Sequence, residues 1–143
     1  MDLYRTHSLE GATGVELTIA LYDGIIQFMH RAIAALEQND AGQRRAAVKR
    51  AMSIVIHLQA TLNMGVGGKP AKALSEFYAA MLALMFQGSQ AKSRKKFEQV
   101  IANVRNVRDA WKQIAAEPSR GPIASPSTWA QEDEQHAGLS VRA

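Results

Sequence analysis

Histidines and carboxylates are the side chains of this chain that could bind a metal or move a proton, but their spacing fits neither task. A di-metal helical bundle needs Glu-x-x-His pairs that project inward. No helix-length segment holds a pair of the histidines, and none follows a glutamate by three residues; they are His7, His30, His57 and His136. The chain lacks cysteine, which excludes disulfides, thiol catalysis and thiolate ligands. We therefore predict no metal and no cofactor.

Glycine and serine motifs do not indicate catalysis either. The stretch GVGG at 65–68 is the only glycine cluster, and it lacks the preceding strand and the following Gly-Lys-Ser/Thr of a phosphate-binding loop. We interpret it as a flexible connection between helices. The sequence contains no Gly-x-Ser-x-Gly element and no triad-like grouping. The chain is therefore predicted not to be an enzyme.

Apolar residues recur at helical spacing in four successive segments, and capping residues mark where the segments begin. Thr13, with Glu16 three residues later, forms a capping box for a first helix that runs to about residue 39. Asp40 caps a second helix, which ends near the stretch NMGVGG. Pro70 suits the first turn of a third helix, and Ser93 caps a fourth.

Short connections between such helices predict an all-α fold, an antiparallel up-down-up-down four-helix bundle over 13–116. Segment 1–12 is expected to be mobile, and segment 117–143, which holds three of the four prolines, to be a disordered tail. Trp129 in that tail is interpreted as an incidental exposed aromatic, with a docking anchor as the alternative. Without a secretory signal or a bilayer-spanning apolar run, the chain is expected to be cytoplasmic, with no stable membrane insertion.

Charge is distributed unevenly along the chain. Residues 1–116 hold 15 Lys and Arg against 9 Asp and Glu, a net of +6, whereas 117–143 hold 2 against 4, a net of −2. The bundle topology brings eight cations to one pole: Arg44, Arg45, Lys49, Arg50, Lys92, Arg94, Lys95 and Lys96. A solubilising face is the favoured interpretation, and attraction of acidic groups is the alternative. Nucleic-acid binding is not predicted, because no aromatics interleave the cations.

Three of the predicted helices carry more apolar residues than one bundle-facing stripe needs. On the first helix, the stripe Leu17, Leu21, Ile25, Phe28 and Ala32 is flanked by a second stripe, which consists of Ile19, Tyr22, Ile26, Met29 and Ile33. Small residues pave the outer side of the third helix, namely Ala73, Ala79, Ala80 and Ala83, and Ile54 and Ile56 flank the stripe of the second. Either the bundle dimerises or is merely apolar outside, or its grooves receive an amphipathic helix from another chain, which the spread over three helices favours.

Gly24 interrupts the apolar pattern of the first helix, where glycine costs roughly 1 kcal/mol relative to alanine. A missing side chain lets a neighbouring backbone approach. The sequence leaves open whether that neighbour is a bundle helix or a partner.

The stretch YRTHSLEGATGVELTIALYDGIIQF resembles the N-terminal signature of the flagellar secretion chaperones, including its Leu-Tyr-Asp-Gly run. The stretch KRAMSIVIHLQATLNMGVGG is similar to the family's second helix, and ALSEFYAAM and DAWKQI resemble its third helix and the end of its fourth. The resemblance extends from Tyr4 to Ile114. Two departures are Gly14 in place of proline and the Gly-Ser pair at 88–89 in place of Ala-Asn.

The resemblance implies a cytoplasmic export chaperone that binds the disordered C-terminal segment of flagellin one to one. It would prevent premature polymerisation and deliver the subunit to the flagellar type III export apparatus, with export-gate components as further partners. Tyr4 and Leu9 are expected to compete with flagellin for the groove. The expected contact residues are Tyr4, Leu9, Ile19, Tyr22, Gly24, Ile26, Met29, Ile33, Ile54, Ile56, Leu58, Ala79, Ala80 and Ala83. A self-associating structural bundle is the alternative, and the chain itself is expected to be a monomer or weak homodimer.

Overall fold

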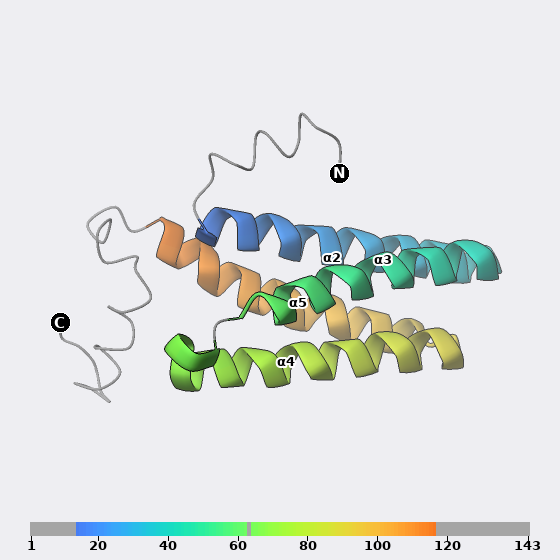
Figure 1. The fold of residues 1–143 in the computed structure, drawn as a ribbon. Helices are drawn as coiled ribbons and strands as arrows, with labels where there is room; N and C mark the ends of the chain where they lie inside the picture. Colours follow the sequence, from blue (N-terminus) through green and yellow to red (C-terminus); the bar gives the residue numbers. More distant parts are fainter. Residues whose placement is uncertain (1–13, 63, 117–143) are drawn as a thin grey trace, which may run out of the picture.

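Four α-helices make up almost all of the part of the chain that the computed structural model describes, residues 14–62 and 64–116. They are α2 (Gly14–Glu37), α3 (Ala41–Ala60), α4 (Met64–Ala91) and α5 (Arg94–Ala115). Successive helices run antiparallel, α2 and α4 each pack against both α3 and α5, and α2 faces α4 across the core (Figure 1). This arrangement confirms the predicted four-helix bundle. The predicted lead segment 1–12, the Thr13 cap and the tail 117–143 lie outside the described residues.

The connections from α2 to α3 and from α4 to α5 share one backbone pattern, a left-handed residue followed by a residue that hydrogen-bonds back to the preceding helix. Asn39 and Lys92 adopt left-handed backbone conformations, with φ of 55° and 52°. The next residue sends its N–H back to a carbonyl of the preceding helix, Asp40 to Ala35 at 2.9 Å and Ser93 to Gly88 at 2.8 Å. These bonds satisfy carbonyls that a helix end would otherwise leave unpaired, so each helix stops and reverses within a few residues.

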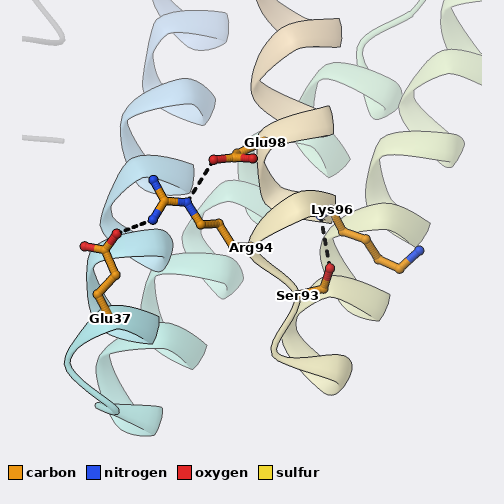
Figure 2. Close-up of polar contacts among 5 residues, drawn as sticks. All are labelled: Glu37, Ser93, Arg94, Lys96 and Glu98. Carbon is orange, nitrogen blue, oxygen red and sulfur yellow. Dashed lines mark hydrogen bonds and ion pairs between the residues drawn. The ribbon is translucent and has the colours of Figure 1, made fainter.

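The residue that closes one helix is followed at once by the N-cap of the next. The Asp40 carboxylate accepts the Gln43 N–H at 3.0 Å. The Ser93 hydroxyl accepts the Lys96 N–H at 3.2 Å, as Figure 2 shows. Both predicted caps are confirmed. With the connections this short, neighbouring helices have to be antiparallel.

The third helix begins earlier than Pro70, which is a correction to the sequence-based prediction. It begins at Met64, so that segment 65–68 belongs to its first turns and is not a connection. A proline inside a helix removes one N–H bond to the carbonyl four residues earlier but keeps a helical φ. The preference of proline for the first turn of a helix therefore placed the start of this helix too late, because the backbone before Pro70 is also helical.

The core shows that α2 buries a wider face than the sequence analysis assigned to the bundle. Its buried residues are Tyr22, Ile25, Ile26, Met29, Ala32, Ile33 and Ala35, and all except Ala35 come from the two predicted stripes. Leu21 and Phe28 of the first stripe are only partly buried. The prediction that the second stripe lacks a partner within the bundle is therefore wrong for most of its members. Since α2 packs between α3 and α5 and faces α4, its buried arc is centred between the stripes.

Candidate partner-binding surface

The motif residues Tyr22 and Trp111 meet inside the bundle. The Tyr22 hydroxyl lies 2.7 Å from the Tyr78 hydroxyl of α4, the two rings pack edge to face at 6.4 Å, and the Trp111 side chain of α5 also hydrogen-bonds Tyr22. Burial raises the pKa of both tyrosines above their ordinary value of 10.0. This network joins α2, α4 and α5 and satisfies polar groups that would be costly to bury alone.

The aspartate of the Leu-Tyr-Asp-Gly run also serves the fold. Asp23 accepts a hydrogen bond from the Arg108 guanidinium on α5 at 2.9 Å, and Arg108 also pairs with its neighbour Asp109 at 3.1 Å. Asp23 and Asp109 are exposed, so these pairs contribute modestly to stability. The Asp23–Arg108 pair links the N-terminal half of α2 to the C-terminal half of α5.

Gly24 faces a bundle helix. A Cβ atom at this position would lie 3.1 Å from Cδ1 of Ile54 on α3, tighter than an ordinary van der Waals contact. The approaching neighbour is therefore the side chain of Ile54 within the chain. The residues that carry the family resemblance on α2 thus build the junctions of α2 with α3, α4 and α5.

The expected contact residues fall into four groups. Five are buried in the bundle, namely Tyr22, Ile26, Met29, Ile33 and Leu58. Three are partly exposed, namely Ile19, Gly24 and Ile54, and four are exposed, namely Ile56, Ala79, Ala80 and Ala83. Tyr4 and Leu9 lie outside the described residues. The five buried residues do not form an exterior groove, since core packing already uses their apolar surface.

An apolar groove runs along the seam between α3 and α4. It has a volume of about 480 Å³ and is lined by Arg45, Val48, Lys49, Met52, Ser53, Ile56, Phe86, Ser89 and Gln90. Ile56 is 53% exposed and Phe86 is 55% exposed, and they are the large apolar residues that the described chain leaves most open to solvent. The exposed Ala79 and Ala83 lie on the same helix as Phe86.

Phe86 is not among the contact residues predicted from the sequence, although its spacing indicates an outer position. Phe86 follows Ala79 by seven residues and Ala83 by three, the spacing of one helical face. Since those alanines were assigned to the outer side of this helix, the same spacing should have placed Phe86 there too. We call the seam from Arg45 to Ile56 on α3, together with Phe86, Ser89 and Gln90 on α4, the α3/α4 groove.

Cations gather at one end of the bundle, as the topology predicted. The Arg44 side chain at the start of α3 is 9% exposed and donates to the Ser89 hydroxyl near the end of α4 at 3.3 Å. Arg94 lies between Glu37 at the end of α2 and Glu98 one turn along α5, as Figure 2 shows. Arg45, Lys49 and Lys95 are exposed and have no acidic partner within the described residues. This end is the basic pole, and Arg45 and Lys49 are also part of the α3/α4 groove.

Neither a metal-binding cluster nor a membrane-spanning helix is found among the described residues. Among residues 14–62 and 64–116, no group of three or more histidine or acidic side chains is placed to hold a metal ion. None of the helices described combines the length and apolar character that crossing a bilayer requires.

These features define a class of protein, a small antiparallel helical bundle that presents an apolar groove with a cationic end. Comparison with known proteins then gives the family. The profile described as "Flagellar protein FliS" matches residues 1–118, and the chain belongs to this family of flagellar secretion chaperones.

Curated relatives agree with this assignment. The chain is 32% identical over 115 residues to the flagellar secretion chaperone FliS of Campylobacter jejuni, which covers 78% of this chain and 89% of that protein. It is 32% identical over 105 residues to that of Salmonella typhimurium, covering 73% and 78%, and 29% identical over 110 residues to that of Bacillus subtilis, covering 77% and 81%. Membership supports an export chaperone role, and the family consists of chaperones and not of enzymes.

Proposed function

We propose that this chain is a cytoplasmic chaperone that binds the C-terminal segment of flagellin one to one, keeps the subunit from polymerising, and passes it to the flagellar type III export apparatus. Family membership supports the chaperone role. The observation that carries the binding proposal is the α3/α4 groove, where two large apolar side chains stay more than half exposed.

The groove suits an amphipathic helix that folds on binding. Phe86 and Ile56 would receive apolar anchors of the flagellin segment, and the small side chains of Ala79 and Ala83 would let its backbone come close. Burying one large apolar side chain contributes about 1.5–3 kcal/mol, and ordering a disordered segment costs about 2–5 kcal/mol. Several apolar anchors are therefore needed to capture the segment. Because the cost of ordering the segment offsets part of the gain from burial, release remains feasible.

The contact set in this proposal is narrower than the sequence alone indicated. It comprises the expected residues that are at least partly exposed, with Phe86 added: Ile19, Ile54, Ile56, Ala79, Ala80, Ala83 and Phe86. The lead residues Tyr4 and Leu9 remain proposed competitors of flagellin. Gly24 leaves the set, because Ile54 already occupies the space beside it.

The test is to mix the purified chain with full-length flagellin or with flagellin that lacks its C-terminal segment, and to measure masses by light scattering coupled to size exclusion. We expect a 1:1 complex with the first and none with the second. Equal binding to both would overturn the proposed recognition of the C-terminal segment. A stable dimer of the chain that ignores flagellin would instead support the self-associating bundle.

A further inference from the structure

We propose that the chain's own C-terminal segment, residues 129–134, docks in the α3/α4 groove, with Trp129 against Ile56 and Phe86 and the acidic run that follows against Lys49 and Arg45. The family profile ends at residue 118, so this segment lies beyond the part shared with the family. Docking requires no client. It therefore stands or falls independently of flagellin capture.

The chemistry of the groove matches that of the segment. The groove combines exposed apolar side chains with Arg45 and Lys49, which have no acidic partner among the described residues. The sequence WAQEDE at 129–134 supplies one large aromatic, and after two residues it continues with three consecutive carboxylates. Segment 117–143 carries a net charge of −2, against +6 for 1–116. Opposite charge would draw the tail to this pole, and the aromatic would select the groove within it.

The tail is long enough to reach the groove. α5 has 22 residues and is about 33 Å long, and it ends at the pole opposite the start of α3 (Figure 1). Residues 117–128 separate the bundle from Trp129, and these 12 residues extend to about 40 Å. The groove begins before the far pole, because Ile56 lies four residues from the end of α3. A loosely extended tail therefore spans the required distance.

The order of groups along the tail also matches the order along the groove. α3 begins at the basic pole, so from the end where the tail starts a peptide would meet Ile56 first, then Lys49, then Arg45. Ile56 follows Arg45 by eleven positions, which corresponds to about 16 Å along the helix. The tail presents Trp129 first and the carboxylates of Glu132, Asp133 and Glu134 next. Apolar and charged groups thus meet their counterparts without the tail reversing direction.

Carbodiimide coupling on the full-length chain tests this placement, because the reagent joins a carboxylate only to an amine in direct contact. We expect an intramolecular link from the tail acids to Lys49. Lys72 on α4 is the control, since it is exposed and lies nearer the origin of the tail. A freely moving tail would label Lys72 at least as often as Lys49, and that result would overturn the proposal. Links mainly to Lys95 would also overturn it, because they would indicate attraction to the pole without use of the groove.

The aromatic contact is tested by acrylamide quenching of Trp129, whose emission is obtained by subtracting that of a Trp129→Phe variant. We expect slow quenching that becomes several-fold faster in Phe86→Asp, while Ala102→Asp on the exposed face of α5 leaves it unchanged. Fast quenching in the unaltered chain would overturn the proposal. Coupled peptides that join isotopically light and heavy chains would overturn docking within one chain in favour of a second copy. A quenching rate that responds to removal of 1–12 and not to Phe86→Asp would also overturn the proposal, because the shielding of Trp129 would then depend on the lead segment and not on the groove.

Discussion

At the scale of single residues, the buried tyrosine pair is the most informative contact. Tyr22 and Tyr78 contribute their rings to the core, and each hydroxyl supplies a partner for the other at 2.7 Å. Burial is the largest cause that raises the pKa of each, because it disfavours the phenolate. The pair therefore fills part of the core and makes the free energy of unfolding depend on pH.

We expect the free energy of unfolding to fall as pH rises above 10. The unfolded tyrosines lose protons near their ordinary pKa of 10.0, whereas the folded pair keeps its protons to higher pH, so the unfolded state binds fewer protons in this range. Below pH 10 this contribution is fully present. Urea unfolding from pH 8 to 11 measures the slope, which should be shallower in Tyr78→Phe. Tyr4→Phe is the matched control, and a Tyr78→Phe slope equal to that of the unaltered chain would contradict the assignment.

Gly24 gives a prediction about packing. Replacing it with leucine should lower the free energy of unfolding by about 1–3 kcal/mol, because the larger side chain has no room beside Ile54. Alanine should cost less, since the tip of Ile54 can shift and alanine adds about 1 kcal/mol of helix propensity. In an Ile54→Val background, which removes the contacting methyl group, Gly24→Ala should be stabilising.

Urea denaturation of the four-member cycle of Gly24→Ala and Ile54→Val measures this coupling. Additive effects within about 0.3–0.5 kcal/mol would mean that the two positions do not compete for space. Gly24→Leu with unaltered stability would refute the packing role altogether.

At the level of secondary-structure elements, the two short connections fix where one helix ends and the next begins. Both reversals combine a left-handed residue with an immediate N-cap, but the two left-handed residues differ in cost. Asn39 tolerates the left-handed conformation, whereas in Lys92 a steric clash between Cβ and the backbone lowers the stability of the fold. Gly88, one turn earlier, has its own reason to lack a side chain, because a Cβ there would lie 2.9 Å from the buried Phe97 ring.

Lys92→Gly should raise the free energy of unfolding by about 1 kcal/mol, because glycine adopts the left-handed region without the Cβ penalty. The gain should exceed that of Asn39→Gly, whose native residue already suits the turn. Lys92→Met serves as the control for loss of charge at the basic pole, since it keeps the Cβ. Thermal and urea unfolding report the result, and a Lys92→Gly variant no more stable than Lys92→Met would contradict the strain argument.

At the scale of the whole molecule, the question is which apolar surface remains after the helices have packed. Most of the excess on α2 is used internally, because this helix touches two neighbours and faces a third. What remains is concentrated at the α3/α4 groove around Ile56 and Phe86. The proposed binding surface therefore lies on faces of these helices that core packing leaves exposed.

Phe86→Asp should separate binding from folding. Because Phe86 is 55% exposed, we expect stability to change by no more than about 0.5 kcal/mol. Flagellin affinity should fall by about 10- to 100-fold, the equivalent of about 1.5–3 kcal/mol of lost burial. Titration calorimetry and thermal unfolding measure the two effects, with Ala102→Asp on α5 as the control for the added charge. Unchanged affinity in Phe86→Asp would remove the α3/α4 groove from the proposed flagellin site.

The four helices, the caps at Asp40 and Ser93, the antiparallel order and the basic pole could be predicted from the sequence, because they depend on local hydrogen bonding, apolar period and connection length. Its resemblance to the flagellar secretion chaperones was confirmed by the comparisons. The packed bundle was needed to show that Met29 and Ile33 belong to the core, that Ile54 is the neighbour of Gly24, and that Phe86 is exposed. The physical reason is that helical periodicity states which residues share a face but not how many neighbours that face meets. In a four-helix bundle, each helix contacts two adjacent helices and faces a third across the core, so its buried face is wider than one stripe. The positions of these three helices determine where that buried face ends.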